Sequence, residues 1–163
     1  MAEIQLAAAI VVHKDHVLIV RRSNSEKLAP GVWGVPCGKL DGDEHPAEAV
    51  IRELLEETGL SGEIVRSADS RTFQSRWNGH WTMNLQWNYL VQPKVDPAKT
   101  DTDDMPLVRL PKEDQAAKWV PTDEIDTIAG MDEHNLATIR QGLAALELSQ
   151  GRSTARISSS WRR

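Results

Sequence analysis

Hydrophobic runs near the start of the chain predict two consecutive strands. Residues 4–13 are almost all apolar, which is typical of a strand that is buried on both faces. Residues 16–22 predict a second strand, and the polar pair Lys14-Asp15 between them predicts a tight hairpin without the glycine that such turns prefer. A polar loop over 23–32 and a short strand over 33–36 are expected to follow.

The helical periodicity is strongest over residues 46–58. Pro46 suits the first helical position, because the N–H that proline lacks would have no partner there. His45 is the expected N-cap, a weaker choice than serine or aspartate. Gly59 can take the left-handed conformation that ends a helix. The sequence therefore predicts one helix with both ends defined.

A strict alternation over residues 80–91 predicts a half-buried strand. Its apolar positions are Trp81, Met83, Leu85, Trp87, Tyr89 and Val91, and its polar positions are Thr82, Asn84, Gln86 and Asn88. We expect the apolar face to pack against the core, with both tryptophans inside it.

The rest of the chain completes a single domain. The patterns predict strand and connection over 61–74, a polar loop over 93–111, a strand over 116–120, a short helix over 122–128 and an amphipathic helix over 132–148. Residues 150–163 form a basic Ser/Arg tail that we expect to be disordered. The predicted organisation is therefore one domain over 1–149 and a tail over 150–163.

Composition excludes several classes of protein. The 163 residues are 40% apolar and 26% charged, which is typical of a globular domain rather than a disordered or fibrous chain. Cys37 is the only cysteine, which excludes an internal disulfide and a four-cysteine zinc site. The longest apolar run, residues 6–12, is too short to cross a membrane, and residues 1–5 carry no basic segment typical of a secretory signal. We expect a cytoplasmic protein with no membrane partner.

The charge is unevenly distributed along the chain. Residues 151–163 contain four arginines and no acid, so residues 1–150 carry 15 basic and 24 acidic side chains. An acidic body repels long nucleic acid, and we expect none as a partner. The excess of acidic side chains over 1–150 suits a protein that binds divalent cations.

Three carboxylates gather on one face of the helix predicted over 46–58. Glu53, Glu56 and Glu57 stand at positions i, i+3 and i+4, which share a face at roughly 100° per residue. Like charges at this spacing destabilise a helix, and a hard cation with oxygen ligands, Mg²⁺ or Mn²⁺, would offset the repulsion. Gly38 permits a close backbone approach to such a cation. The alternative is a solvated acidic surface that binds no metal.

The segment over 38–60, GKLDGDEHPAEAVIRELLEETGL, resembles the signature of the Nudix family. That signature is G, five residues, E, seven residues, R-E-U-x-E-E-x-G-U, where U is a bulky aliphatic residue. The specified positions are matched by Gly38, Glu44, Arg52, Glu53, Leu54, Glu56, Glu57, Gly59 and Leu60. Looser similarity extends over 4–148, whereas Cys37 departs from the second glycine that most relatives carry.

The resemblance implies a fold and an activity. The fold is an α/β fold, an α/β/α sandwich around a central mixed β-sheet, and the activity is hydrolysis of a nucleoside diphosphate linked to another group. Carried over by position, Glu53, Glu56 and Glu57 would bind Mg²⁺ or Mn²⁺, together with the carbonyl oxygen of Gly38. Arg52 would orient the glutamates.

The residue that takes the proton of the attacking water stays open at this point. Glu53, Glu56 and Glu113 are all candidates for the base. Glu113 lies in a segment that is similar to the loop of MutT-type members that supplies a further acid, so it is also a candidate metal ligand. Asp114 competes for that role.

Substrate contacts are expected from residues near the predicted strand ends. Arg21, Arg22 and Lys39 could bind phosphate, and Trp33 could stack on a base, although each also fits an ordinary surface position. The substrate is a small nucleotide-like diphosphate; a nucleotide sugar, ADP-ribose and capped RNA stay open. The resemblance favours a nucleoside triphosphate, including oxidised forms. The rival is a Nudix-like module that senses nucleotide without hydrolysis. A homodimer is compatible with the resemblance.

Overall fold

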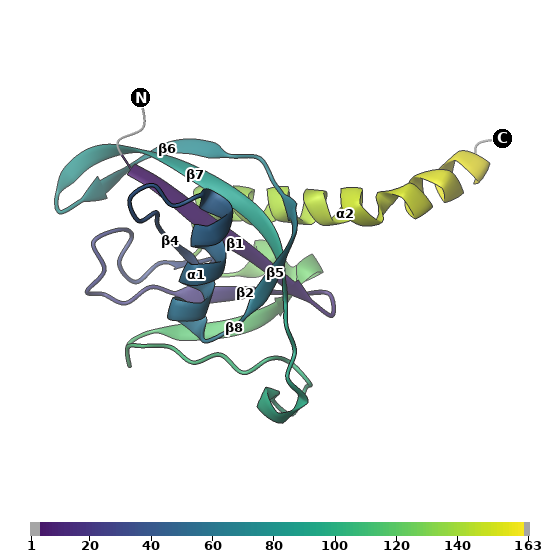
Figure 1. The fold of residues 1–163 in the computed structure, drawn as a ribbon, viewed down its shortest axis with the longest axis horizontal. Coiled ribbons are helices and arrows are strands. Elements are labelled where there is room, and N and C mark those ends of the chain that lie inside the picture. The colour runs from purple at the N-terminus through teal and green to yellow at the C-terminus, as the bar shows by residue number, and fades with distance from the viewer. Residues whose placement is uncertain (1–3, 162–163) are drawn as a thin grey trace.

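A mixed sheet lies between two helices in the computed structural model, which describes residues 4–161, with side chains up to 150 (Figure 1). The strands are β1 (Ile4–His13), β2 (His16–Arg21), β3 (Trp33–Gly34), β4 (Cys37–Lys39), β5 (Gly62–Ser67), β6 (Arg71–Trp77), β7 (His80–Pro93) and β8 (Ala116–Pro121). The helices are α1 (Pro46–Thr58) and α2 (Glu133–Trp161), with short 3₁₀ helices η1 (Pro97–Lys99) and η2 (Thr122–Thr127). Because α1 and α2 cover opposite faces of the sheet, the predicted α/β/α sandwich is confirmed.

Strand β1 is the centre of the sheet. It runs parallel to β7 on one side and antiparallel to β2 and β4 on the other. Ala7, Ala9 and Val11 pack into the cluster beneath α1, whereas Ala8 and Ile10 pack into the cluster on the α2 side. The burial of both faces explains why this strand is apolar at nearly every position, as predicted.

The predicted hairpin between the first two strands is confirmed. His13 pairs with His16, so Lys14 and Asp15 alone form the turn. Both have positive φ, 48° and 59°, which is the mirror-image turn that matches the twist of paired strands.

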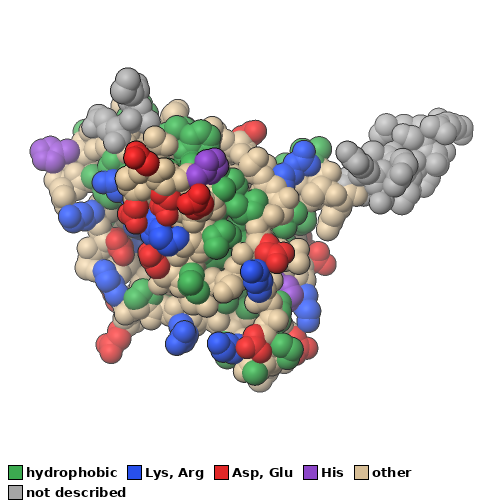
Figure 2. Space-filling model, in the orientation of Figure 1, with side chains coloured by type: hydrophobic (Ala, Val, Ile, Leu, Met, Phe, Trp, Pro, Cys, Tyr) green, Lys and Arg blue, Asp and Glu red, His purple; other side chains and the backbone are tan. Residues whose placement is uncertain are grey.

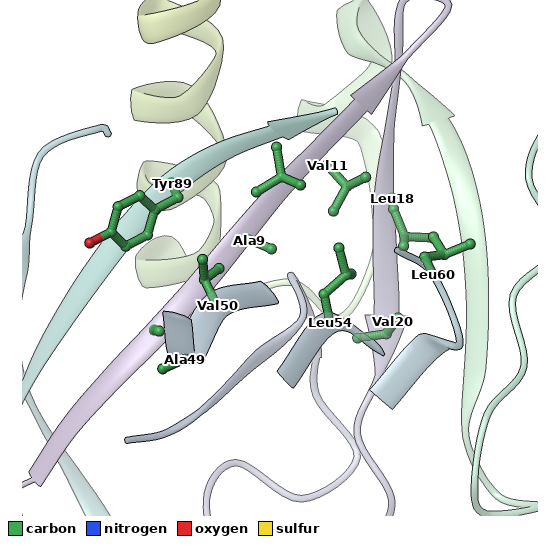
Figure 3. Packing of buried hydrophobic residues seen from close by; sticks show 11 residues of the cluster. Ala9, Val11, Leu18, Val20, Ala49, Val50, Leu54, Leu60 and Tyr89 are labelled. Atoms are coloured by element: carbon green, nitrogen blue, oxygen red, sulfur yellow. The ribbon is translucent and has the colours of Figure 1, made fainter. Parts of the chain in front are cut away.

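Helix α1 has the predicted ends. The His45 side chain accepts a hydrogen bond from the Ala47 amide at 3.0 Å, and Gly59 ends the helix with φ 74°. Val50 and Leu54, 1% and 0% exposed, press against the strands (Figure 3). This packing fixes the rotation of α1 about its axis, so Glu53, Glu56 and Glu57 lie outside the apolar cluster that the helix covers.

The buried face of β7 is the polar one, so the predicted orientation of this strand is wrong over its first half. Asn84, Gln86 and Asn88 are at most 3% exposed, whereas Trp81 is 65% exposed. Trp87 is half-buried. The alternation shows that the two faces differ, but burial depends on which face other elements cover. Beneath α1 the apolar face is buried, and Tyr89 belongs to the core there.

Asn84 shows how a polar face can be buried at low cost. Its Oδ1 accepts a hydrogen bond from Trp77 Nε1 at 3.0 Å. Its Nδ2 lies within hydrogen-bond distance of Ser75 Oγ at 2.7 Å and of the carbonyl oxygens of Phe73 and Thr82, both at 3.2 Å. Because the donors and the acceptor have partners, the amide is stable without water.

Two further segments differ from the predictions or extend beyond them. The strand predicted over 33–36 is limited to β3, and Gly38 lies in the short strand β4, which the sequence patterns did not predict. Helix α2 continues through residue 150, where the tail was expected to begin, but the side chains from 151 on lie outside the described residues. The expected disorder of 150–163 stays a prediction. No helix in the described part of the chain combines the length and the apolar character that crossing a membrane requires.

Candidate active site

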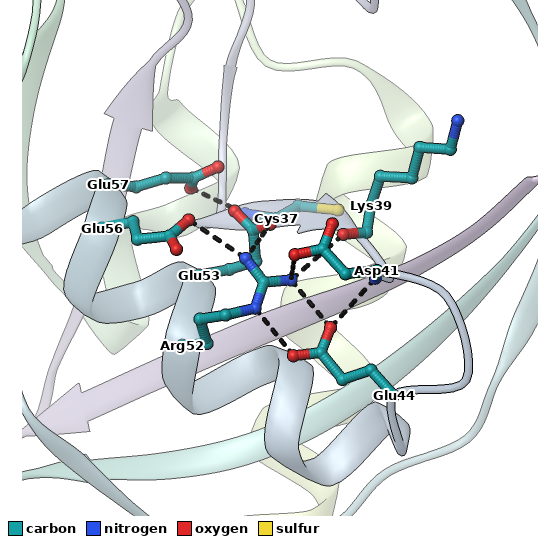
Figure 4. A network of polar contacts seen from close by, with 8 residues as sticks. All are labelled: Cys37, Lys39, Asp41, Glu44, Arg52, Glu53, Glu56 and Glu57. Atoms are coloured by element: carbon teal, nitrogen blue, oxygen red, sulfur yellow. Dashed lines mark hydrogen bonds and ion pairs between the residues drawn. The ribbon is translucent and has the colours of Figure 1, made fainter.

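Arg52 stands at the centre of the acidic face of α1 (Figure 4). Acidic and basic side chains gather on the molecular surface over this helix (Figure 2). The guanidinium group of Arg52 binds both carboxylate oxygens of Glu44, Nε to Oε2 at 2.7 Å and Nη2 to Oε1 at 2.8 Å. Its Nη1 donates to Glu53 at 2.9 Å and to Glu56 at 3.0 Å. The hydrogen bonds from Arg52 lower the pKa of Glu44 to about 2. The hydrogen bond to Glu44 is in turn the main reason that the pKa of Arg52 is raised. One side chain therefore positions three carboxylates.

The same arginine holds the preceding loop against the helix. Arg52 Nη2 lies 3.3 Å from the carbonyl oxygen of Lys39 and 3.4 Å from Asp41 Oδ2. Glu44 Oε1 also accepts a hydrogen bond from the Asp41 amide at 3.0 Å. These contacts hold the loop between β4 and α1 against the acidic face of the helix.

Glu53 lies directly over Gly38. A side chain at position 38 would overlap with the carboxyl group of Glu53, so the approach of the two residues requires glycine. The side chain of Glu53 is 14% exposed, and burial raises its pKa, an effect that the bond from Arg52 opposes. The pairing of β4 with β1 places Gly38 under the helix.

Glu57 points toward the sheet rather than toward Arg52. Its Oε2 accepts a hydrogen bond from the Cys37 amide at 3.2 Å. Burial, and secondarily the charge of Glu53, raises the pKa of Glu57 to about 8, although Arg22 opposes the shift. A nearby cation would favour the ionised form of this carboxyl group. By contrast, the side chain of Glu56 is 58% exposed.

The three glutamates thus share one face of α1 but have different partners. Glu53 and Glu56 contact Arg52, whereas Glu57 contacts the backbone of β4. Within the described residues, no three carboxylate, imidazole or thiol side chains converge closely enough to form a metal site. The chemistry of these side chains nevertheless fits a hard divalent cation, because Glu53, Glu56 and Glu57 offer carboxylate oxygens and Glu57 is partly shielded from water.

A cavity of about 800 Å³ adjoins this face. Its walls come from the loop between β2 and β3, from β6 and from the start of α2, and Arg22 and Cys37 lie in its lining near Glu57. Its apolar lining residues are Leu28, Ala29, Pro30, Val32, Val35, Cys37 and Phe73. Polar and charged side chains, Glu26 and Asp132 among them, make up much of the rest of the lining. Apolar surface combined with polar groups is typical of small-molecule sites, and this volume is large enough for a nucleoside.

Gln86 fixes the polar part of the cavity lining. Its Nε2 lies 2.7 Å from Asn88 Oδ1 and 3.2 Å from Thr138 Oγ1. Its Oε1 lies 3.1 Å from His134 Nε2 and 3.7 Å from Cys37 Sγ. These contacts join β4, β7 and α2, so the cavity lining is held in one arrangement.

His134 packs on Phe73, with 3.9 Å between the ring centroids and 32° between the planes. Burial lowers the pKa of His134, which favours the neutral imidazole. No sequence motif marked Gln86, His134 or Phe73 as a site residue. Gln86 lies on the polar face of the alternation over 80–91. Assigning that face to the interior would have identified Gln86 as a buried polar residue.

The predicted phosphate and base contacts fall in different places. Arg22 lines the cavity, and its Nε donates to the Leu28 carbonyl at 2.7 Å. Arg21 donates to the Asp114 carbonyl at 2.9 Å instead. Neither Trp33 nor Lys39 belongs to the cavity lining, and Lys39 is exposed.

Trp33 contacts two basic side chains. Lys118 Nζ lies 4.7 Å from a Trp33 ring centroid, and the guanidinium carbon of Arg21 lies 5.8 Å from it. Cations over an aromatic face stabilise a surface packing arrangement. Of the four residues predicted to contact substrate, the structure therefore brings Arg22 alone to the cavity lining.

Asp114 and Glu113 differ in their contacts. Asp114 Oδ2 accepts hydrogen bonds from the Asn24 amide at 2.8 Å and Ser23 Oγ at 3.0 Å, and these bonds lower its pKa. Asp114 thereby holds the loop that forms one wall of the cavity. Glu113 is exposed, and no hydrogen bond or ion pair joins it to the three glutamates in the described structure. Its role stays a prediction.

A family model described as the NUDIX domain matches residues 3–141. The chain belongs to the Nudix family. This Nudix chain is 29% identical to Nudix hydrolase 25 of Arabidopsis thaliana over 121 residues, which cover 67% of the chain and 66% of that protein. It is 42% identical to the RNA pyrophosphohydrolase of Acidiphilium cryptum over 64 residues, 36% of the chain and 39% of that protein. The chain thus matches less than two thirds of the length of these two curated relatives.

The fold matches that of solved Nudix structures. One of them is the NUDIX domain of Shewanella oneidensis NrtR complexed with ADP ribose, with a TM-score of 0.64 and 22% identity. The match covers 90% of each chain. The Nudix resemblance drawn from residues 38–60 is therefore confirmed, and so is the fold.

Proposed function

We propose that this Nudix protein is a divalent-metal-dependent hydrolase of the diphosphate bond in a nucleotide-like substrate. The observation that carries the proposal is the position of Glu57, whose partly buried carboxyl group lies between the acidic face of α1 and the cavity. Nudix hydrolases generally use divalent metal ions and act on small nucleotide-like substrates. The intact set of glutamates supports hydrolysis over simple nucleotide sensing.

Glu53, Glu56 and Glu57 would hold Mg²⁺ or Mn²⁺, with the carbonyl oxygen of Gly38. When bound, the metal neutralises the diphosphate and makes a bound water more acidic. A carboxylate then takes the water's proton as the oxygen attacks phosphorus and the bridging P–O bond breaks. Glu56 suits this role because its side chain is the most exposed of the three. Glu53 and Glu113 stay as the other candidates for the base.

Arg52 acts as a positioning residue in this proposal. It holds Glu53 and Glu56 at 2.9 and 3.0 Å while Glu44 binds its other edge. A side chain with several fixed partners restricts the rotamers of the carboxylates, which lowers the entropy cost of binding a cation.

The cavity would hold the base and sugar of the substrate. Arg22 lies both in the cavity lining and near Glu57, so the phosphates of a bound nucleotide would extend from the cavity toward the glutamates. We propose a nucleoside triphosphate as the preferred substrate, including oxidised forms. The names of the relatives keep RNA 5′ ends and ADP-ribose as the alternatives to test.

A substrate panel tests the proposal. The protein is incubated with Mg²⁺ and with ATP, GTP, 8-oxo-dGTP, ADP-ribose, a nucleotide sugar and a 5′-triphosphorylated oligonucleotide, and release of phosphate and pyrophosphate is measured. Turnover of at least one compound that requires Mg²⁺ supports a hydrolase. Tight nucleotide binding without turnover of any compound would support the sensing module instead.

Gly38→Ala is expected to lower the rate of hydrolysis by about a hundredfold. The added methyl group would overlap with the carboxylate of Glu53 and displace it, and a displacement of about 1 Å can cost that much activity. The melting temperature should change little, since Gly38 has no positive φ. Gly42→Ala, in the loop that follows β4, is the control for added bulk, because a methyl group there meets no atom within 4 Å. The φ of 49° at Gly42 disfavours alanine, so this variant should lose some stability without losing activity. Equal activity of the two variants would contradict the proposed packing.

A further inference from the structure

The hairpin formed by β6 and β7 carries an exposed aromatic side chain with a cation beside it. Trp81 is 65% exposed, the largest fraction among the large hydrophobic side chains that the structure describes. Arg76 pairs with Trp81 across the two strands, and its guanidinium carbon lies 5.2 Å from a ring centroid. An aromatic face of this kind can stack on any nucleic-acid base.

The same hairpin is free of acidic residues. Residues 70–95 contain no aspartate or glutamate, although the whole chain has 24. The hairpin strands carry Arg71 and Arg76 instead. It is therefore a positively charged region on an otherwise acidic domain, and a phosphate chain would be attracted there rather than repelled.

The hairpin is continuous with the cavity. Four consecutive residues of β6, from Phe73 to Arg76, line the cavity. Because neighbouring residues of a strand point to opposite faces of the sheet, the cavity must contact both faces of β6. The cavity therefore follows the outer edge of β6, which has no other strand paired to it within the described sheet. A chain that leaves the cavity across this edge passes Arg76 and reaches Trp81.

We propose that Trp81 and Arg76 form a second nucleotide subsite, which stacks on the second base of a short 5′-phosphorylated oligonucleotide. This inference rests on the proposed function: the first nucleoside occupies the cavity and its 5′ phosphates reach the glutamates of α1. The subsite takes no part in bond breaking. Because the rest of the domain is acidic, the contact is limited to the second nucleotide and does not extend to long nucleic acid.

The first experiment compares hydrolysis of the triphosphorylated dinucleotide pppApG with hydrolysis of ATP. In Trp81→Ala, the ratio of kcat/KM for pppApG to kcat/KM for ATP should fall about tenfold. Trp81→Phe should keep most of the wild-type ratio, because phenylalanine also stacks. Leu148→Ala is the control, since Leu148 is 63% exposed but lies on α2, outside the cavity lining. An unchanged ratio in Trp81→Ala would overturn the inference.

A binding measurement separates this inference from the proposed function. Affinities for AMP and for the dinucleotide pApG are measured by calorimetry, which requires no turnover. Trp81→Ala and Arg76→Ala should each weaken pApG binding several-fold relative to AMP. This result without hydrolysis of any nucleotide would support the subsite and refute the hydrolase. Equal effects on AMP and pApG would refute the subsite, whatever the turnover.

Discussion

Glu56→Gln is expected to lower the rate of nucleotide hydrolysis by roughly a thousandfold. Glutamine keeps the shape of the side chain but removes the charge that would hold a divalent cation or take a proton from water. The fold should survive, because the side chain of Glu56 is 58% exposed and its hydrogen bond to Arg52 can be replaced by the amide oxygen. Steady-state assays on the preferred nucleotide measure the loss.

Glu48→Gln is the matched control for this prediction. Glu48 is exposed on the same helix, and it is outside the hydrogen-bond network around Arg52. The same change of charge there should alter activity less than twofold, roughly the effect expected of an isolated surface charge. Comparable losses in the two variants would show that the net charge of α1, rather than the position of Glu56, controls the reaction.

Asn84→Leu is expected to lower the free energy of unfolding by about 3 kcal/mol, even though it places an apolar side chain in the interior. Asn84 is 0% exposed, and its amide is the partner of Trp77 Nε1 and of the Phe73 carbonyl. Leucine would leave these groups without a partner in a partly dehydrated region. Denaturant unfolding followed by circular dichroism measures the change.

Gln92→Leu provides the comparison for this substitution, because Gln92 is an exposed amide on the same strand. Its replacement should change the free energy of unfolding by no more than about 0.5 kcal/mol. If Asn84→Leu instead left the protein as stable as the wild type, the hydrogen bonds of the buried amides would not be what stabilises this face of β7.

Local patterns were sufficient to predict the elements whose determinants are local. The helix over 46–58 has a cap at His45 and a left-handed residue at Gly59, so both ends could be read from neighbouring residues. Strand β1 is apolar at nearly every position because it is covered on both faces, and its sequence alone indicates this. The acidic face of α1 follows from the helical period.

Features that depend on contacts between distant segments could not be predicted in this way. The burial of Gln86 depends on Thr138 and His134, which are about fifty residues away and belong to α2. The strand β4 is too short to show a period, so its pairing with β1, which brings Gly38 under Glu53, was not foreseen. The cavity combines three such segments, and for this reason its lining was largely missed.

Neighbouring residues in the loop before β8 illustrate the same limit on a smaller scale. The sequence favoured Glu113 as the site residue, with Asp114, the next residue, competing for the role. The structure gives Asp114 two hydrogen bonds that hold the cavity wall, through Asn24 and Ser23. Which of two adjacent side chains makes such contacts depends on backbone direction, which composition and spacing do not fix.

Binding of Mn²⁺ to the protein tests most directly whether the three glutamates of α1 are metal ligands. It is measured by electron paramagnetic resonance and by calorimetry. We expect saturable binding in the wild type. The variant with Glu53→Gln, Glu56→Gln and Glu57→Gln combined should bind at least about a hundredfold more weakly. A wild type that takes up no Mn²⁺, or a triple variant that binds it equally well, would contradict the assignment of these glutamates as metal ligands.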